Sequence, residues 1–163
     1  MSPVESANVR IEVTISYQVG HAAPVKRTAT LTVADQGQGF LRSGNQVAVP
    51  STTLLGNPAS HVEGGAAGQP VMSFNYRSVG LNVDARNVMI QGNKARMNLN
   101  VEFSAVDEKA ADSAGRPPSF PTFSESLSLV LESGKPLVVG QSSDFVDNVE
   151  RKQTVEVTAT ILR

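Results

Sequence analysis

Apolar and polar residues alternate along much of the chain, which is the pattern of a β-strand with one face against a core. The alternation begins in 9–19, where valine, isoleucine and tyrosine are interleaved with charged residues, threonine, serine and glutamine. It returns through 28–33, where alanine, leucine and valine alternate with threonine. The residues between them, 20–24, contain glycine and proline and read as a turn, so the pattern predicts a long β-hairpin.

The rest of the chain continues in the same way. The parity of the apolar positions changes between Tyr76 and Val79, which predicts a bulge or bend near 77–78. Pro50 is expected to end the strand that precedes it. The pattern further predicts, in chain order, short strands at 39–42 and 46–49 across a turn at 43–45, a long irregular loop at 51–70, strands at 72–76 and 79–85, a turn at 91–93, a strand at 95–105, a loop at 107–121, and strands at 123–131, 136–139 and 155–161.

No segment of helical length shows a helical spacing of apolar residues, so the chain belongs to the all-β class. We predict an antiparallel β-sandwich or partly open barrel of about eight to nine strands. The 163 residues suit one domain of ordinary size. We expect a flexible N-terminus at 1–8 and a single β domain at 9–163.

The outward positions of the strand at 95–105 are uniformly polar and of mixed charge. A sheet face turned to solvent and a face lining an aqueous lumen both produce this pattern. The two interpretations stay open on the sequence alone.

Charge and composition exclude several classes. The chain has 14 Lys and Arg against 15 Asp and Glu and shows no run of like charges, which argues against a nucleic-acid-binding protein. It has no uninterrupted apolar stretch near the roughly 20 residues that a membrane-spanning helix needs. It also lacks cysteine, which is compatible with either a reducing or an oxidising compartment.

No arrangement of residues predicts catalysis. His21 and His61 stand far apart in the chain, without cysteines to complete a zinc site, and an enzyme that pairs one of them with a carboxylate is the weaker alternative. No Gly-x-Ser-x-Gly elbow is present. Asp107, Glu108 and Asp112 do not have the spacing of a calcium loop. We therefore predict no catalytic, cofactor-binding or metal-binding residues, no cofactor and no enzymatic activity.

Four segments, in this order, resemble the C-terminal secretin domain, the part of bacterial type II and type III secretion and pilus channels that forms a multimeric outer-membrane gate. The resemblance covers about 28–162 and looks closest to small stand-alone secretin-like proteins of acidobacterial type. The four segments are LTVADQGQGFLRSGNQVAVP at 31–50, FNYRSVGLNVD at 74–84, MNLNVEFS at 97–104 and the stretch at 121–140 that ends in LVLESGKPLVVG.

The resemblance implies a non-enzymatic structural protein of the bacterial cell envelope that self-associates or docks envelope partners. Its location would be the periplasm, the outer membrane or the exterior, after removal of a signal peptide, with membrane association only through assembly. On the residues themselves, the strands at 9–19 and 153–162 are expected to be edges that pair with a neighbour. The alternative is a soluble monomeric β-sandwich that binds a ligand through the loops at 51–70 and 107–121.

Overall fold

The structure, a computed structural model, describes residues 7–53, 71–106 and 120–163. These residues form eight strands in two antiparallel four-stranded sheets, which confirms the predicted all-β sandwich. The strands are β1 (Asn8–Val19), β2 (Val25–Ala34), β3 (Gly39–Thr53), β4 (Val71–Gln91), β5 (Lys94–Ser104), β6 (Thr122–Glu132), β7 (Pro136–Val146) and β8 (Val149–Leu162).

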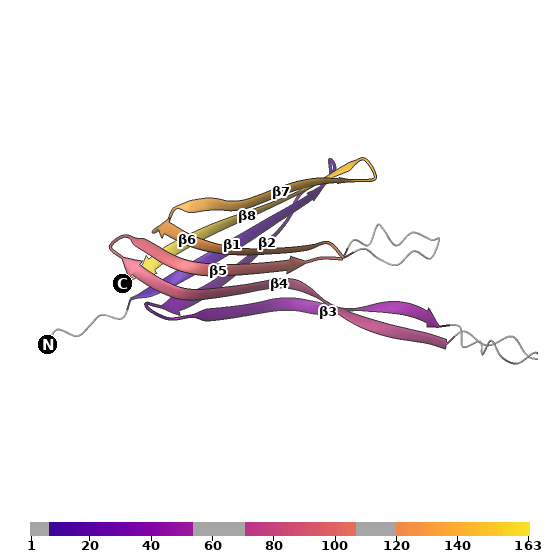
Figure 1. Cartoon of the computed structure of the whole chain (residues 1–163), viewed down its shortest axis with the longest axis horizontal. Coiled ribbons are helices and arrows are strands. Elements are labelled where there is room, and N and C mark those ends of the chain that lie inside the picture. The colour runs from indigo at the N-terminus through magenta and orange to yellow at the C-terminus, as the bar shows by residue number, and fades with distance from the viewer. Residues whose placement is uncertain (1–6, 54–70, 107–119) are drawn as a thin grey trace, which may run out of the picture. The chain divides into compact units, whose positions relative to one another are not determined.

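The first sheet has the strand order β2-β1-β8-β7 and the second has the order β3-β4-β5-β6 (Figure 1). The predicted hairpin of β1 and β2 is confirmed, with Ile15 opposite Arg27. The first and last described strands also pair, along the whole length of β1, with Asn8 opposite Leu162 and Val19 opposite Arg151. Both ends of the described chain are therefore held in the centre of one sheet.

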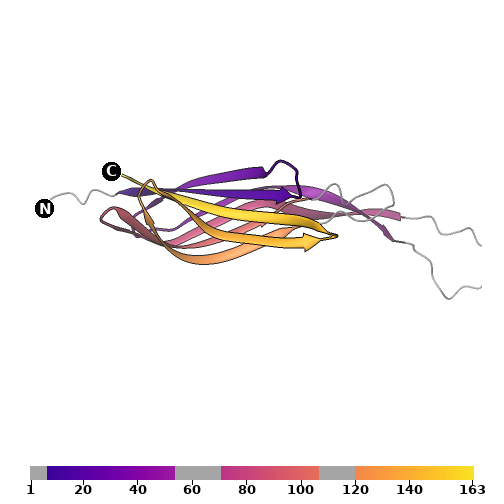
Figure 2. The same cartoon turned by 90° about the horizontal axis from the view of Figure 1, so that it is seen from above.

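Contacts divide the chain into two compact units. Unit 1 comprises 1–43, 80–103 and 122–163, and unit 2 comprises 44–79 and 104–121. Unit 1 contains all of the first sheet and all of β6, together with parts of β3, β4 and β5. Figure 2 shows its strands in a second view.

The core of unit 1 is entirely apolar among the described residues. Alternate residues of the strands supply it, because every second side chain of a strand points to the same face. Burial of this apolar area is the main stabilising contribution. The fully buried large side chains are Ile11, Ile15, Met97, Leu99, Leu131, Val9, Val13, Val83, Val88, Val101, Val155 and Val157.

The chain passes from the first sheet to the second through the turn after β2. The Asp35 carboxylate accepts hydrogen bonds from the backbone N–H of Ile90 at 2.8 Å and of Gln36 at 3.1 Å. The Gln36 N–H also donates to the Val88 carbonyl at 2.7 Å, and Gln36 has a φ of 60°. One aspartate thus fixes both the crossing and the end of β4.

The chain returns to the first sheet through the turn after β6. The Ser133 N–H donates to the Asn93 carbonyl at 2.9 Å, and the Ser133 hydroxyl accepts the N–H of Ile161 at 3.0 Å. Gly134, with a φ of 80°, donates its N–H to the Ala159 carbonyl at 2.8 Å. Glycine adopts this left-handed conformation without the strain that a Cβ atom brings.

In unit 2, hydrogen bonds join neighbouring segments. The Ser73 hydroxyl donates to the Ser51 carbonyl at 3.2 Å, and the Ala105 N–H donates to the Pro121 carbonyl at 3.1 Å. Large apolar side chains at alternate positions of β4, those of Met72, Phe74 and Tyr76, are mostly exposed.

Three local predictions were wrong. The turn at 43–45 does not form, and Pro50 lies inside a strand, because β3 runs unbroken over 39–53. A proline is tolerated there because β3 is an edge strand, whose outer N–H groups need no partner within the sheet. The strand predicted at 136–139 continues to Val146. It ends in a tight turn in which Asp147 and Asn148 both have positive φ, a conformation that these residues tolerate better than most others.

Candidate assembly edges

The edge strands of unit 1 are the places where another chain could add to the sheets. They are β2 and β7 in the first sheet, and β3 and β6 in the second. The predicted edges at 9–19 and 153–162 are therefore wrong. Those segments are β1 and β8, which pair on both sides in the centre of the first sheet. Their alternation predicts a strand but carries no information about its neighbours.

Each sheet has an even number of antiparallel strands, so its two edges run in opposite directions. A second copy could therefore add its β2 to the β7 edge and continue the alternation of strand direction. The same holds for β3 of a second copy at the β6 edge. The backbone N–H and C=O groups of an unpaired edge are suited to such pairing.

The β6–β7 side of unit 1 contains a carboxylate that faces inward. Glu125 shares the inward face of β6 with Phe123 and Leu127, and its side chain is only partly exposed. It lies against Gly140 of β7, where an added Cβ would collide with both carboxylate oxygens. A β-bulge lies between Val138 and Gly140. Because glycine has no side chain, there is room above Gly140 for the Glu125 carboxylate.

Glu125 is electrostatically unfavourable in this position. Burial raises the pKa of its carboxyl above the ordinary value of 4.5, since removal from water disfavours the charged form. Its Oε2 atom is buried without a hydrogen-bond partner. A half-buried carboxylate of this kind destabilises the isolated chain.

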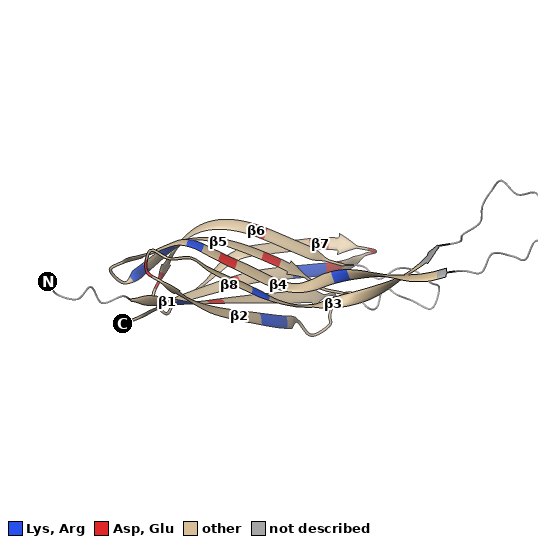
Figure 3. Ribbon diagram, turned by 90° about the horizontal axis from the view of Figure 1, so that it is seen from below, with Lys and Arg blue, Asp and Glu red and all other residues tan. Residues whose placement is uncertain are grey.

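The opposite side of unit 1, between β2 and β3, carries positive charge. A hollow of about 410 Å³ lies there, lined by residues 27–30 of β2, 41–43 of β3 and Leu81. Arg42 forms an ion pair with Asp84, which raises the pKa of the guanidinium further. Arg27 is exposed, and its side chain makes no ion pair or hydrogen bond with the residues that the structure describes. Figure 3 shows positive and negative positions interspersed over the strands.

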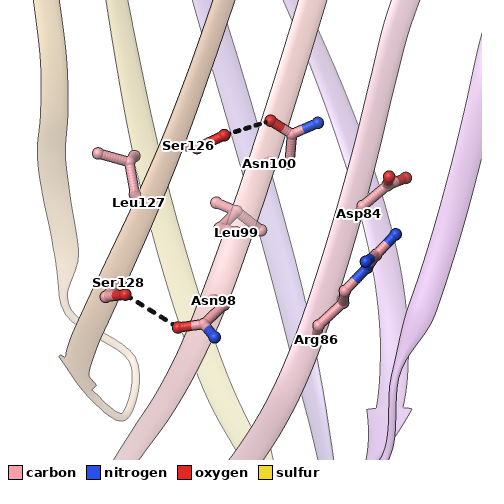
Figure 4. Close-up of a pocket in the computed structure, with 8 residues that line it drawn as sticks. All are labelled: Asp84, Arg86, Asn98, Leu99, Asn100, Ser126, Leu127 and Ser128. Atoms are coloured by element: carbon pink, nitrogen blue, oxygen red, sulfur yellow. Dashed lines mark hydrogen bonds between the residues drawn. The ribbon is translucent and has the colours of Figure 1, made fainter.

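The outer face of the second sheet is polar. The Ser126 hydroxyl donates to Asn100 Oδ1 at 2.8 Å and the Ser128 hydroxyl donates to Asn98 Oδ1 at 2.9 Å. These residues line a shallow hollow of about 420 Å³ together with Asp84 and Arg86 (Figure 4). Arg86 also lies 5.9 Å from the ring centroid of Phe40. The face is well suited to contact with water or polar solutes, and the described residues place no nucleophile there with an adjacent base.

The residues considered for chemistry do not come together in the described parts of the chain. His21 lies in the turn between β1 and β2 with its side chain exposed. His61, Asp107, Glu108 and Asp112 lie outside the described residues. In the described ranges, no group of three His, Cys, Asp or Glu side chains is placed to hold a metal ion. These same ranges contain no helix that is long and apolar enough to cross a membrane.

Sequence reasoning missed the pairing of Glu125 with Gly140. One signal was present, because Glu125 interrupts the inward apolar series of β6 between Phe123 and Leu127. Its neighbour across the sandwich could not be inferred, since Gly140 belongs to the other sheet.

This arrangement of two four-stranded antiparallel sheets, with β1 and β8 in the centre of one and β3 to β6 in the other, is the fold of the secretin domain. The resemblance of the sequence to that domain is thereby confirmed at the level of fold. ExeD of Aeromonas hydrophila is similar with a TM-score of 0.60 and 14% identity, over 98% of this chain and 49% of that one.

Two further solved structures share the fold. The secretin GspD of the type II secretion system of E. coli K12 has a TM-score of 0.55 and 12% identity, over 96% of this chain and 48% of that one. PulD, from the type II secretion system outer membrane complex of Klebsiella pneumoniae, has a TM-score of 0.53 and 13% identity, over 96% and 39%. The chain therefore spans half or less of the length of these neighbours. No protein-family model matches the sequence, and no curated protein matches it.

Proposed function

We propose that this protein is a non-enzymatic assembly component of the bacterial cell envelope, a secretin-domain-like unit that associates with further copies of itself through its strand edges. The observation that carries the proposal is the presence of open, oppositely directed edges on both sides of unit 1. Each sheet can be continued by a second copy without loss of the antiparallel alternation. Repeated head-to-tail addition of this kind generates a ring when the rotation closes.

The fold neighbours support the same role. They are secretins, and one of them was solved within an outer membrane complex of a type II secretion system. By analogy with these proteins, the periplasm or the outer membrane is the proposed location, and copies of the chain or envelope proteins are the proposed partners. Membrane association would follow from assembly, and no role with nucleic acid is proposed.

The monomeric binding module remains the alternative. It relies on the loops at 51–70 and 107–121, of which 54–70 and 107–119 lie outside the described residues. No feature of the described residues favours it over assembly.

Sedimentation velocity of the purified chain separates the two functions. Assembly predicts species larger than a monomer whose share rises with protein concentration, both in buffer and in the presence of lipid vesicles. A monomer at every concentration and in both conditions would overturn the proposal and leave the binding module as the better account.

A further inference from the structure

Two charged groups lie at the same level of the first sheet: the Arg27 side chain at the β2 edge, and the carboxylate of Glu125, from β6 of the second sheet, over the β7 edge. Arg27 of β2 is opposite Ile15 of β1, Ile15 is opposite Val155 of β8, and Val155 is opposite Gly140 of β7. Glu125 fills the space at Gly140. These paired residues form one row across the sheet, which begins at the Arg27 cation and ends at Gly140, beneath the Glu125 carboxylate.

Both side chains face the inside of the sandwich. Arg27 has the same parity along β2 as the buried residues Ala29 and Leu31. Gly140 is opposite the fully buried Val155, so its inward side is the side on which the Glu125 carboxylate lies. The parity matters because a shift of one residue in strand pairing would turn Arg27 to the opposite face.

We propose that Glu125 of one copy forms an ion pair with Arg27 of the next copy when β7 of the first pairs with β2 of the second, which makes these two residues the charge contact that selects the register of assembly. The inference depends on the proposed self-association and identifies the residues that direct it. The occupant of the β6–β7 side is a second copy of this chain.

The geometry of an antiparallel pair supports the contact. Residues directly opposite each other in such a pair have Cα atoms about 5 Å apart, with side chains on the same face. If the rows continued into a second copy, with the β7 bulge between Val138 and Gly140 kept in the new pairing, Arg27 of that copy would be next to Gly140 and on its inward side. The guanidinium would then lie beside the carboxylate that occupies the space above Gly140.

The Glu125 carboxylate lacks a hydrogen-bond donor among the described residues, and the Arg27 guanidinium could be that donor. Glu125 Oε2 is buried without a hydrogen bond, and Arg27 makes no side-chain ion pair with the described residues of its own chain. A planar guanidinium matches a carboxylate with two parallel hydrogen bonds. In the isolated chain, an inward carboxylate next to an edge also hinders indiscriminate strand pairing.

An apolar contact two rows away agrees with the same register. Leu137 of β7 is opposite the buried Val157 and so faces inward, yet 46% of it is exposed because it lies at the open edge. Val157 is opposite Val13 of β1, and Val13 is opposite Ala29 of β2, so the row that ends at Leu137 begins at Ala29. Pairing of β7 with β2 of a second copy would therefore bring Ala29 of that copy next to Leu137.

Charge reversal tests the contact. Glu125→Arg and Arg27→Glu should each weaken self-association by at least about tenfold in sedimentation velocity. The double variant, which carries both changes in every copy, should recover association to within a few-fold of the wild type. Circular dichroism of each variant establishes that it folds, and Glu125→Gln, which keeps the shape of the side chain, should also weaken association.

The matched control reverses two outward charges of the same sheet, Lys26→Glu on β2 and Glu12→Arg on β1, and should leave association unchanged. If the wild type associates and the two single reversals associate equally well, or the double variant does not recover, the ion pair is refuted while self-association stands. If the wild type itself never associates, the proposed function fails.

Discussion

Glu125 of β6 and Gly140 of β7 fit together across the two sheets of unit 1, with the carboxylate lying where any side chain at position 140 would be. A charged group inside a sandwich is unfavourable for the isolated chain. Its position at an open edge gives it a use, because a neighbouring copy can supply the missing cation. The relationship leads directly to two predictions.

Gly140→Ala should destabilise the chain by about 1 kcal/mol, because the new methyl group displaces the Glu125 carboxylate or the backbone of β7. Chemical denaturation of the dilute protein measures the change. The combined variant Glu125→Ala/Gly140→Ala tests the cause. If the collision with Glu125 is responsible, most of the loss caused by Gly140→Ala disappears when residue 125 is already alanine, whereas equal losses in both backgrounds would show that β7 itself rejects the methyl group.

The ionisation of Glu125 should make the isolated chain less stable as the pH rises. Burial raises the pKa of the folded carboxyl above 4.5, so the folded chain holds its proton more tightly than the unfolded chain. Its stabilising contribution is complete below pH 4.5 and is lost as the pH rises through the folded pKa. The difference in unfolding free energy between the wild type and Glu125→Gln, followed over pH, measures this effect and should favour the variant more at pH 7 than at pH 4. A difference that stays constant with pH would show that the carboxyl is not desolvated.

Asp35→Ala should destabilise the chain by about 1–3 kcal/mol, because it removes the acceptor for the Ile90 N–H and leaves a part-buried donor unpaired. Asp35→Asn keeps an oxygen acceptor and should lose less than half as much. Thermal or denaturant unfolding compares the two. Equal losses in both variants would show that the charge of Asp35, and not its hydrogen bond to Ile90, stabilises the crossing.

Two serine hydroxyls should differ in their contributions to stability. Ser133→Ala removes the acceptor for the part-buried Ile161 N–H and should cost about 1 kcal/mol. Ser128→Ala removes an exposed hydrogen bond to Asn98 and should change stability by no more than about 0.5 kcal/mol. The contrast fails if Ser128→Ala proves the more damaging of the two in denaturant unfolding.

Alternation of side chains predicted the all-β class and most strand positions because half-buried strands repeat every two residues. It gave the hairpin of β1 and β2 and the strand over 95–105. It missed the second half of β7, since residues such as Gln141 and Ser142 are polar on both faces at an exposed edge. The prediction that Pro50 ends a strand was wrong for a related reason. An edge strand tolerates a proline, which has no N–H to donate, whereas a central strand does not.

The candidate site depended on information that alternation does not contain. The order of strands in a sheet is set by long-range pairing, so the alternation pattern offers no reason to place β1 and β8 in the centre. The row that joins Arg27 to Gly140 passes through four strands from both ends of the chain. Only the register of all three pairings brings these two positions to one level.

Cysteine cross-linking between copies tests the head-to-tail pairing of β7 with β2 most directly. Thr28 and Val138 lie in one row at the two edges of the first sheet, through Thr14 and Glu156. Within one chain they are separated by three strand spacings, about 14 Å, which is too far for a disulfide. The chain has no native cysteine, so every disulfide that forms must join the introduced residues.

A mixture of the single variants Thr28→Cys and Val138→Cys should give a disulfide-linked dimer of one chain of each kind under mild oxidation, and the double variant should give a ladder of covalent oligomers. A control mixture of Thr28→Cys with Glu156→Cys on the central strand β8 should give neither. Absence of the mixed dimer, or an equal yield from the control mixture, would contradict assembly through these edges.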